Sequence, residues 1–300
     1  MTRSDLRVGM VGLGAIGLPM AQNLRRAGLL QRVHTRSRTA EQDPALKGAK
    51  ACSSPSETAQ NIDVLLICVS DDAAVDAVLF GRDGATHGLA PGSTVVDCST
   101  ISPATAQAAA DRLSQQGVHY IDAPVTGGTE GARTGSLTVL VGGEKSVLEA
   151  IRPVLEGIGS TIQYFGPSGS GQQVKAVNQV LVAGSYAAVA EAMALGQHLG
   201  LPMPLVVDAL QSGAAGSWAL RHRSQAMLDA HYPLGFRLSL HHKDLNIALG
   251  AAEAVGLDLP VTERVQAMEA ELIGDGHGDE DVSCLRRWMD RPSSETTSLG

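Results

Sequence analysis

The chain has 300 residues and a formal net charge of −8, from 31 acidic against 23 basic side chains. This length predicts two domains with a sizeable buried core. A hydrophobic fraction of 44% with 18% charged residues excludes a wholly disordered chain. The acidic balance argues against a surface that coats nucleic acid. Glycine is abundant, with 34 residues or about 11% against a usual ~7%, so we expect glycines at positions with special requirements.

The sequence gives no sign of a membrane segment or of export. The longest apolar stretches resemble Val64–Val69, far short of the ~20 residues that span a bilayer. Residues 1–5 lead directly into an apolar segment, which leaves no room for a signal peptide. The four cysteines are widely spaced, and Cys68 and Cys98 lie in apolar runs typical of buried positions. We expect a cytoplasmic protein that binds neither membrane nor nucleic acid.

Short apolar runs alternate with helix-like stretches in the first half. A strand-like segment over residues 6–13 precedes helical spacing over residues 18–27. This alternation predicts an α/β domain in which helices cover both faces of a parallel sheet. Further strands are expected at Val33, Val64–Val69, Thr94–Cys98, Val118–Asp122, Leu137–Val141 and Thr161–Phe165.

The second half has a helical pattern throughout. One proline-free stretch, from Gln172 to about Leu199, predicts a helix about 40 Å long that ends at Gly200. Later helices are expected over Pro204–Leu210, Ser217–Leu228, Phe236–Val255 and Pro260–Ile273. We therefore expect domains over residues 1–168 and 169–290, the second of them all-α, and a flexible tail over residues 291–300.

A glycine-rich turn follows the first predicted strand. The segment Gly12–Gly17 has the pattern G-x-G-x-x-G between a strand and a helix, which is the context of a dinucleotide site. Gly12 permits the tight turn, Gly14 lets the backbone approach a pyrophosphate, and Gly17 lets the helix pack against the strand. The predicted cofactor-binding residues of this turn are Gly12, Leu13, Gly14, Ala15, Ile16 and Gly17.

The residues after the second predicted strand favour NADP(H) over NAD(H). An NAD site usually places a carboxylate at this point, to bind the ribose hydroxyls. Here Thr35, Arg36 and Ser37 follow the strand, and the next carboxylate is Glu41. A guanidinium with neighbouring hydroxyls suits a 2′-phosphate. The alternative is that Arg36 and Arg38 are solvated surface charges.

Four stretches carry a resemblance to a known family. They are Gly12–Leu24 (GLGAIGLPMAQNL), Asp122–Gly131 (DAPVTGGTEG), Gly169–Gln179 (GSGQQVKAVNQ) and Lys243–Ala248 (KDLNIA). In order and spacing they resemble the β-hydroxyacid dehydrogenase family of the 6-phosphogluconate dehydrogenase superfamily, which includes 3-hydroxyisobutyrate dehydrogenases and semialdehyde reductases. The resemblance implies an N-terminal Rossmann domain, a long interdomain helix and an all-α C-terminal domain. It also implies assembly into a homodimer or homotetramer.

The second stretch supplies the substrate's carboxylate site in this resemblance. Thr126, Gly127 and Gly128 hold that carboxylate, and the hydroxyl of Thr126 replaces a serine that is common in relatives. A hydroxyl followed by two glycines can expose several donors. By spacing alone, an ordinary glycine turn is the better interpretation.

The resemblance implies that the third stretch supplies the proton donor. Lys175 matches the family's catalytic lysine, and the positive end of the helix near its start favours the neutral amine that proton transfer needs. By itself, a lysine is more often a solvated surface residue. The amides Asn178 and Gln179 are implied to contact substrate. Gln179 is one carbon longer than the usual asparagine, which leaves the size of the substrate open.

The remaining predicted site residues are more scattered. The resemblance implies that Lys243 closes over the nicotinamide end of the cofactor and that Asp244 helps to organise Lys175. Trp218 and Phe236 match positions that shape the pocket, although core packing is an equal alternative. Val69, Ser70 and Thr100 follow strand ends and are expected beside the cofactor.

The resemblance, together with the glycine turn, implies reversible hydride transfer between a nicotinamide and a small 3-hydroxy acid, semialdehyde or keto acid. No metal is expected, and the pair His241–His242 is interpreted as surface or helix-end residues. Decarboxylating 6-phosphogluconate dehydrogenases use a second acid where this chain has Val182. Imine reductases usually replace the lysine, and inactive nucleotide-sensing or scaffold relatives tend to lose it. The last two remain as alternatives.

Overall fold

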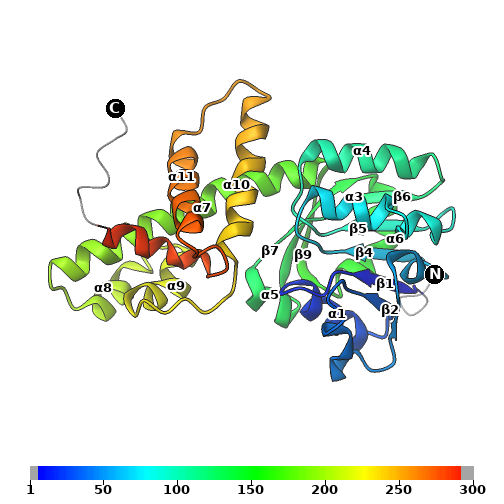
Figure 1. Cartoon of the computed structure of the whole chain (residues 1–300), viewed down its shortest axis with the longest axis horizontal. Helices are drawn as coiled ribbons and strands as arrows, with labels where there is room; N and C mark the ends of the chain where they lie inside the picture. The colour runs from blue at the N-terminus through cyan, green and yellow to red at the C-terminus, as the bar shows by residue number, and fades with distance from the viewer. Residues whose placement is uncertain (1–5, 292–300) are drawn as a thin grey trace. The chain divides into compact units, whose positions relative to one another are not determined.

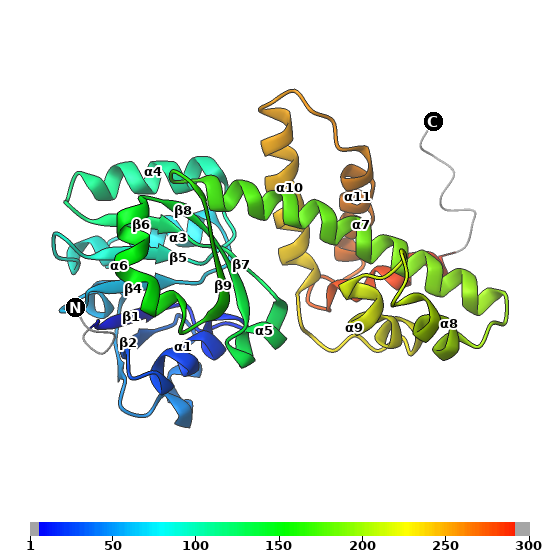
Figure 2. The same ribbon diagram turned by 180° about the vertical axis from the view of Figure 1, so that it is seen from behind.

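The structure is a computed structural model that describes residues 6–291. These residues form two compact units, which divide between Lys175 and Ala176 (Figures 1 and 2). The sequence predicts a domain boundary between residues 168 and 169, and this boundary stays a prediction. The predicted tail over residues 291–300 lies outside the described residues, except for Arg291.

One sheet forms the centre of the first unit. Its strands run in the order β3-β2-β1-β4-β5-β6-β8-β7, and β9 also pairs with β8. The central strands β1 (Val8–Val11), β4 (Val64–Ile67) and β5 (Thr94–Asp97) are buried at every residue, as is typical of strands covered on both faces. The other strands are β2 (Leu30–His34), β3 (Lys50–Ala51), β6 (His119–Asp122), β7 (Val125–Thr126), β8 (Leu137–Gly143) and β9 (Gly159–Gly166).

The sheet is parallel from β3 to β6 and mixed beyond it. Strand β8 runs antiparallel to both β6 and β7, and β9 runs parallel to β8. The prediction of a parallel sheet is therefore confirmed for the strands from β3 to β6, whereas β8 runs in the opposite direction to β6. The chain order changes direction between β1 and β4, where open α/β sheets bind ligands.

Alternate side chains of the strands fill two separate cores. On β1, Met10 belongs to the core beneath α1 (Gly17–Arg26) and α6 (Lys145–Leu155), and Val11 belongs to the core beneath α3 (Asp72–Phe80) and α4 (Pro103–Ser114). This alternation follows the period of two along a strand. The shorter helices are α2 (Pro55–Thr58), α5 (Gly128–Thr134) and the 3-10 segments η1 (Ala40–Gln42), η2 (Pro44–Leu46) and η3 (Ala85–His87).

The second unit is helical throughout its described residues. Helix α7 (Ser170–His198) begins in the first unit and continues through the second. Helices α10 (Leu238–Glu253) and α11 (Pro260–Gly274) lie side by side (Figure 1). The remaining elements are α8 (Met203–Leu210), α9 (Trp218–Leu228) and η4 (Val282–Asp290).

Helix α7 is long and apolar enough to cross a membrane by length and composition. Its residues Ala183, Tyr186, Ala190 and Met193 are buried in the core of the second unit. A core helix passes the same test as a spanning helix, and these buried side chains identify α7 as a core helix.

Candidate functional site

The predicted site residues of the first unit follow the carboxyl ends of adjacent parallel strands. The glycine turn follows β1, Thr35 follows β2, Val69 follows β4 and Thr100 comes after β5. The segment that holds Thr126 begins after β6. The residues brought to this edge are Gly12, Leu13, Gly14, Ala15, Ile16, Gly17, Thr35, Arg36, Ser37, Val69, Ser70, Thr100, Thr126, Gly127 and Gly128.

The three glycines of the turn meet different surroundings. Gly12 has a φ of +95°, and a Cβ there would lie 2.1 Å from the carbonyl oxygen of Cys68. A Cβ on Gly17 would lie 2.0 Å from the carbonyl oxygen of Gly12, whereas a Cβ on Gly14 would meet nothing within 4 Å. The open space over Gly14 lies at the amino-terminal end of α1, where the helix dipole favours an anion such as a pyrophosphate.

A buried carboxylate organises the turn after β2. The side chain of Glu41 is 3% exposed; its Oε1 accepts the Thr35 N–H at 2.8 Å and its Oε2 lies 3.0 Å from the Arg38 guanidinium. Thr35 Oγ1 in turn accepts the Leu13 N–H at 3.4 Å. Arg36 is exposed beyond this arrangement. Sequence reasoning noted Glu41 only as a distant carboxylate and missed this role.

The loops after β4 and β5 are tied together. The Val69 N–H donates to Ser99 Oγ at 3.0 Å, and the Ser99 N–H donates to Asp97 Oδ1 at 2.9 Å. Tyr120 Oη donates to the other Asp97 oxygen at 3.1 Å. Burial raises the pKa of Asp97 to about 6, against the opposing effect of these hydrogen bonds. Ser70 is exposed, and its hydroxyl donates to Asp71.

Lys175 is held against the predicted carboxylate-binding segment. The side chain lies on α7 and is 8% exposed, and its Nζ donates to the Val125 carbonyl oxygen at 3.0 Å. Thr126 follows Val125 directly, and Gly127 and Gly128 both have positive φ, at 128° and 65°. The structure therefore places a lysine amine, a hydroxyl and a glycine turn at one edge of the first unit.

The amides after Lys175 belong to a polar chain in the second unit. Gln179 is 1% exposed; its Nε2 donates to Asp244 Oδ2 at 2.7 Å and its Oε1 accepts from Asn178 Nδ2 at 2.7 Å. Lys243 Nζ lies 2.7 Å from the other Asp244 oxygen. Within this unit, Gln179 holds Asn178 and Asp244.

Trp218 and Phe236 are linked through an ion pair. Trp218 is 39% exposed, stacks on His222 and lies under the Arg223 guanidinium at 4.7 Å from the ring centroid. Arg223 Nε lies 3.6 Å from Asp281 Oδ1, and Asp281 Oδ2 accepts the Phe236 N–H at 2.8 Å. Phe236 is half-buried against the core of the second unit.

The interpretation of His241 as a surface residue is wrong. Its side chain is fully buried, and its Nδ1 lies 2.6 Å from Glu269 Oε1 on α11. The histidine can be buried because the carboxylate partner is buried with it. Within residues 6–291, no group of three or more His, Cys, Asp or Glu side chains has the arrangement of a metal site.

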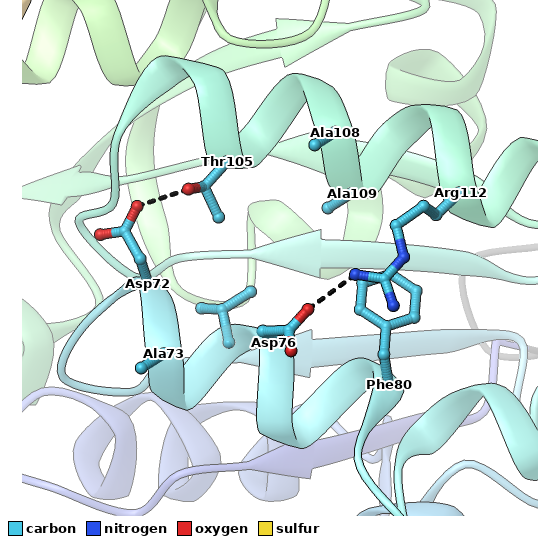
Figure 3. Close-up of a pocket in the computed structure, with 9 residues that line it drawn as sticks. Asp72, Ala73, Asp76, Phe80, Thr105, Ala108, Ala109 and Arg112 are labelled. Carbon is cyan, nitrogen blue, oxygen red and sulfur yellow. Dashed lines mark hydrogen bonds and ion pairs between the residues drawn. The ribbon is translucent and has the colours of Figure 1, made fainter.

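A hollow of about 340 Å³ lies between α3 and α4 (Figure 3). Thr105 donates to Asp72 at 2.6 Å, and Arg112 donates to Asp76 at 2.7 Å and lies over the Phe80 ring. These polar side chains are paired with one another. The predicted site residues do not line this hollow.

Comparisons with known proteins cover nearly the whole chain. Residues 7–166 match a family model described as the NAD binding domain of 6-phosphogluconate dehydrogenase. Residues 169–289 match one described as the NAD-binding of NADP-dependent 3-hydroxyisobutyrate dehydrogenase.

Individual relatives extend over the same range. The 2-hydroxy-3-oxopropionate reductase of Escherichia coli is 37% identical over 93% of this chain and 96% of its own. The NAD-dependent L-serine dehydrogenase of Pseudomonas aeruginosa is 33% identical over 95% and 98%. The crystal structure of a 3-hydroxyisobutyrate dehydrogenase from Salmonella typhimurium has a TM-score of 0.87 and 34% identity, over 94% of this chain and 99% of that one.

The fold and these matches agree on one group of enzymes. The fold consists of the sheet described above, a long helix and a helical second unit. The relatives with the matching sequences and structure are named for the oxidation of hydroxy acids or for the reverse reduction. They do not favour an imine reductase or an inactive nucleotide-sensing relative. The chain belongs to the β-hydroxyacid dehydrogenase family of NAD(P)-dependent oxidoreductases.

Proposed function

We propose that the protein transfers hydride reversibly between NADP(H) and a small 3-hydroxy acid or its semialdehyde or keto-acid counterpart, with Lys175 as the general acid and base. The observation that carries this proposal is the largely buried Lys175 amine, bonded to the Val125 carbonyl oxygen beside Thr126. A positioned amine next to a hydroxyl and a glycine turn supplies both a proton and a carboxylate site.

The protein's own residues bind, orient and move a proton. The glycine turn and the positive end of α1 would hold the pyrophosphate over Gly14. The Thr126 hydroxyl and the neighbouring glycine N–H groups would orient the substrate carboxylate. Lys175 gives its proton to the substrate oxygen during reduction and takes it back during oxidation. The bound nicotinamide supplies or accepts the hydride.

Two features of the turn after β2 support NADP(H). Arg36 and Ser37 are exposed, where they can meet a 2′-phosphate. The nearest carboxylate, Glu41, is engaged by the Thr35 N–H and by Arg38. It is therefore unavailable for the ribose hydroxyls that an acidic residue binds in NAD sites.

The substrate class follows from the carboxylate site and from the relatives' names. Relatives named for 2-hydroxy-3-oxopropionate, L-serine and 3-hydroxyisobutyrate all act on small carboxylic acids that bear a hydroxyl or carbonyl group. We infer a substrate of this size for the present chain, in the cytoplasm.

An apolar face along α7 supports a homodimer or homotetramer. Val177, Leu181 and Leu195 lie on it, Leu199 directly follows the last residue of α7, and all four are between 62% and 70% exposed. Their spacing places them along one side of the helix. Exposed apolar surface of this extent is typical of an interface between protein chains.

The proposal is tested with a panel of small 3-hydroxy acids, semialdehydes and cyclic imines, assayed with NADPH and NADH. We expect Lys175→Ala to lower kcat on the best carbonyl substrate by about 10²- to 10⁴-fold while NADPH still binds. Lys145→Ala, an exposed lysine on α6, is the matched control and keeps wild-type turnover. Full turnover by Lys175→Ala would refute the acid–base role, and turnover of imines alone would support an imine reductase.

Cofactor preference needs its own variant. We expect Arg36→Asp to weaken NADPH binding by about 10- to 100-fold, because it removes a charge-assisted contact, and to leave NADH binding nearly unchanged. Arg82→Asp makes the same change at an exposed position away from the turn and serves as the control. Equal NADPH affinity in both variants would contradict the assignment.

A further inference from the structure

A buried carboxylate lies beneath the start of α7. Asp122 is the last residue of β6 and is fully buried. Its Oδ1 accepts the Gly169 N–H at 2.8 Å and its Oδ2 accepts the Gln172 N–H at 3.0 Å. These donors lie immediately before and within the first turn of α7. The carboxylate therefore supplies acceptors that the first N–H groups of a helix lack.

Two glycines surround this carboxylate closely. A Cβ on Gly142 of β8 would lie 2.6 Å from Asp122 Oδ1, and a Cβ on Gly171 would lie 2.8 Å from Asp122 Oδ2. A Cβ on Gly171 would also lie 2.3 Å from the Leu140 carbonyl oxygen. The helix start is thus packed directly on the sheet, with Asp122 between them.

The first turns of α7 contact two segments that hold candidate site residues, the one with Thr126 and the one with Thr100. One turn beyond Gln172, Lys175 donates to the carbonyl oxygen of Val125, which is in the segment that Asp122 begins. The side chain of Gln172 donates to the Ser99 carbonyl oxygen at 2.9 Å and accepts the Ile101 N–H at 3.2 Å. These two bonds flank Thr100.

We propose that Asp122 is a positioning residue: by fixing the first turn of α7 it sets the place of the Lys175 amine and, through Gln172, of the loop around Thr100. This inference rests on the proposed role of Lys175. Asp122 itself touches neither substrate nor cofactor in this account. Its effect on the reaction passes entirely through the helix that it holds.

The test compares Asp122→Asn with Asp72→Asn. An asparagine keeps the size of the side chain but turns an N–H donor toward one of the two helix N–H groups, so the first turn must move. Asp72 is the matched control, because it accepts from Ser102 N and Thr105 Oγ1 at the start of α4, which carries no candidate site residue (Figure 3). We expect kcat to fall by about 10- to 100-fold in Asp122→Asn and to change less than twofold in Asp72→Asn.

The pH profile separates positioning from general destabilisation. In the reductive direction, the rate falls at high pH as Lys175 loses its proton. Removing the negative charge beside the positive end of α7 should move that limb lower by about 0.2–0.7 pH unit. Asp97 and Tyr120 are the other titratable groups buried beside Asp122, and both variants retain them. Asp72→Asn should leave the limb in place.

Hydrogen exchange gives a readout that needs no turnover. We expect the amides of residues 172–175 to exchange faster in Asp122→Asn and at the wild-type rate in Asp72→Asn. If Asp122→Asn does not fold, Asp122→Ser retains one small acceptor and is judged by the same measurements. The proposal would be overturned if an Asp122 variant matched Asp72→Asn in three measurements: kcat, the position of the high-pH limb of the rate profile, and the exchange rate of amides 172–175. Wild-type protein that is inactive on the whole substrate panel would instead refute the proposed function.

Discussion

The two units hold their candidate site residues in different ways. In the first, all but Lys175 follow strand ends, and backbone groups constrain several of them, such as Gly12 against Cys68 and Lys175 against the Val125 carbonyl. In the second, all but Phe236 lie on helices, and several are held by other side chains, such as Gln179 on Asp244.

This difference decides which contacts of the site depend on the identity of a side chain. A backbone group stays at the end of its strand whatever side chain it carries, so the first unit keeps its site through the sheet and its glycines. A pair of side chains can be exchanged without moving a strand. We therefore expect changes in the glycine turn of the first unit to affect folding or cofactor binding, and changes in the Gln179–Asp244 pair of the second to affect substrate binding.

The largest effect should come from the glycine turn. Gly12→Ala forces a Cβ to 2.1 Å from the Cys68 carbonyl oxygen at a φ of +95°, and we expect about 3–6 kcal/mol of lost stability in thermal or denaturant unfolding. Gly14→Ala meets nothing within 4 Å; it should keep the wild-type melting temperature and lose NADPH affinity. If Gly12→Ala had the stability of wild type, the close contact with the Cys68 carbonyl oxygen would not constrain this turn.

The buried carboxylate of β5 tests whether the first unit depends on charge as well as backbone. The folded-state pKa of Asp97, about 6, lies above its usual 3.8. Stability from the protonated form is therefore complete below about pH 4 and is lost as the pH rises to about 6. We expect the free energy of unfolding of wild type, relative to Asp97→Asn, to fall by about 2 kcal/mol between pH 4 and pH 7.

Urea unfolding across this pH range measures the Asp97 effect. Asp76→Asn, an exposed carboxylate on α3, is the control and should leave the pH dependence of wild type in place. Parallel pH profiles for wild type and Asp97→Asn would show that burial of Asp97 does not cost stability.

The smallest effect is expected in the second unit. Gln179→Asn is too short to keep both the Asp244 and the Asn178 contacts, and we expect a loss of about 1–2 kcal/mol in stability and a changed KM for substrate. Gln211→Asn is the control, because Gln211 bonds Asp208 in the same way on the exposed surface. An unchanged KM for every substrate would mean that this side-chain network does not influence the substrate.

Most of the fold could be predicted from the sequence, because apolar runs and their period mark the long elements. Strand β7 was missed, since two residues, Val125–Thr126, show no period. The reversal of β8 was also missed, because a strand's residues do not reveal its direction. These gaps lie where pairing with a distant strand, rather than local pattern, defines the element.

The candidate site could be predicted where it depends on motifs, but not where it depends on distant pairs. The glycine turn and Lys175 stand in recognisable sequence contexts. The contacts of Gln179 with Asp244 and of His241 with Glu269 join residues far apart in the chain. Nothing in either local sequence names its partner, which explains why His241 was assigned to the surface.

The crowding of Gly171 against the sheet has a consequence for how such sequences diverge. The close contact of Gly171 with the Leu140 carbonyl oxygen fixes the position of the helix at this residue. A residue inserted or deleted between Gly171 and Lys175 would therefore turn the Lys175 side chain by about 100° around the helix axis. On the proposed role of Lys175, homologues that keep the reaction are free to change the side chains at 173 and 174 but not their number. The proposal therefore predicts that a relative with an alignment gap between 171 and 175 lacks the proton donor at this place.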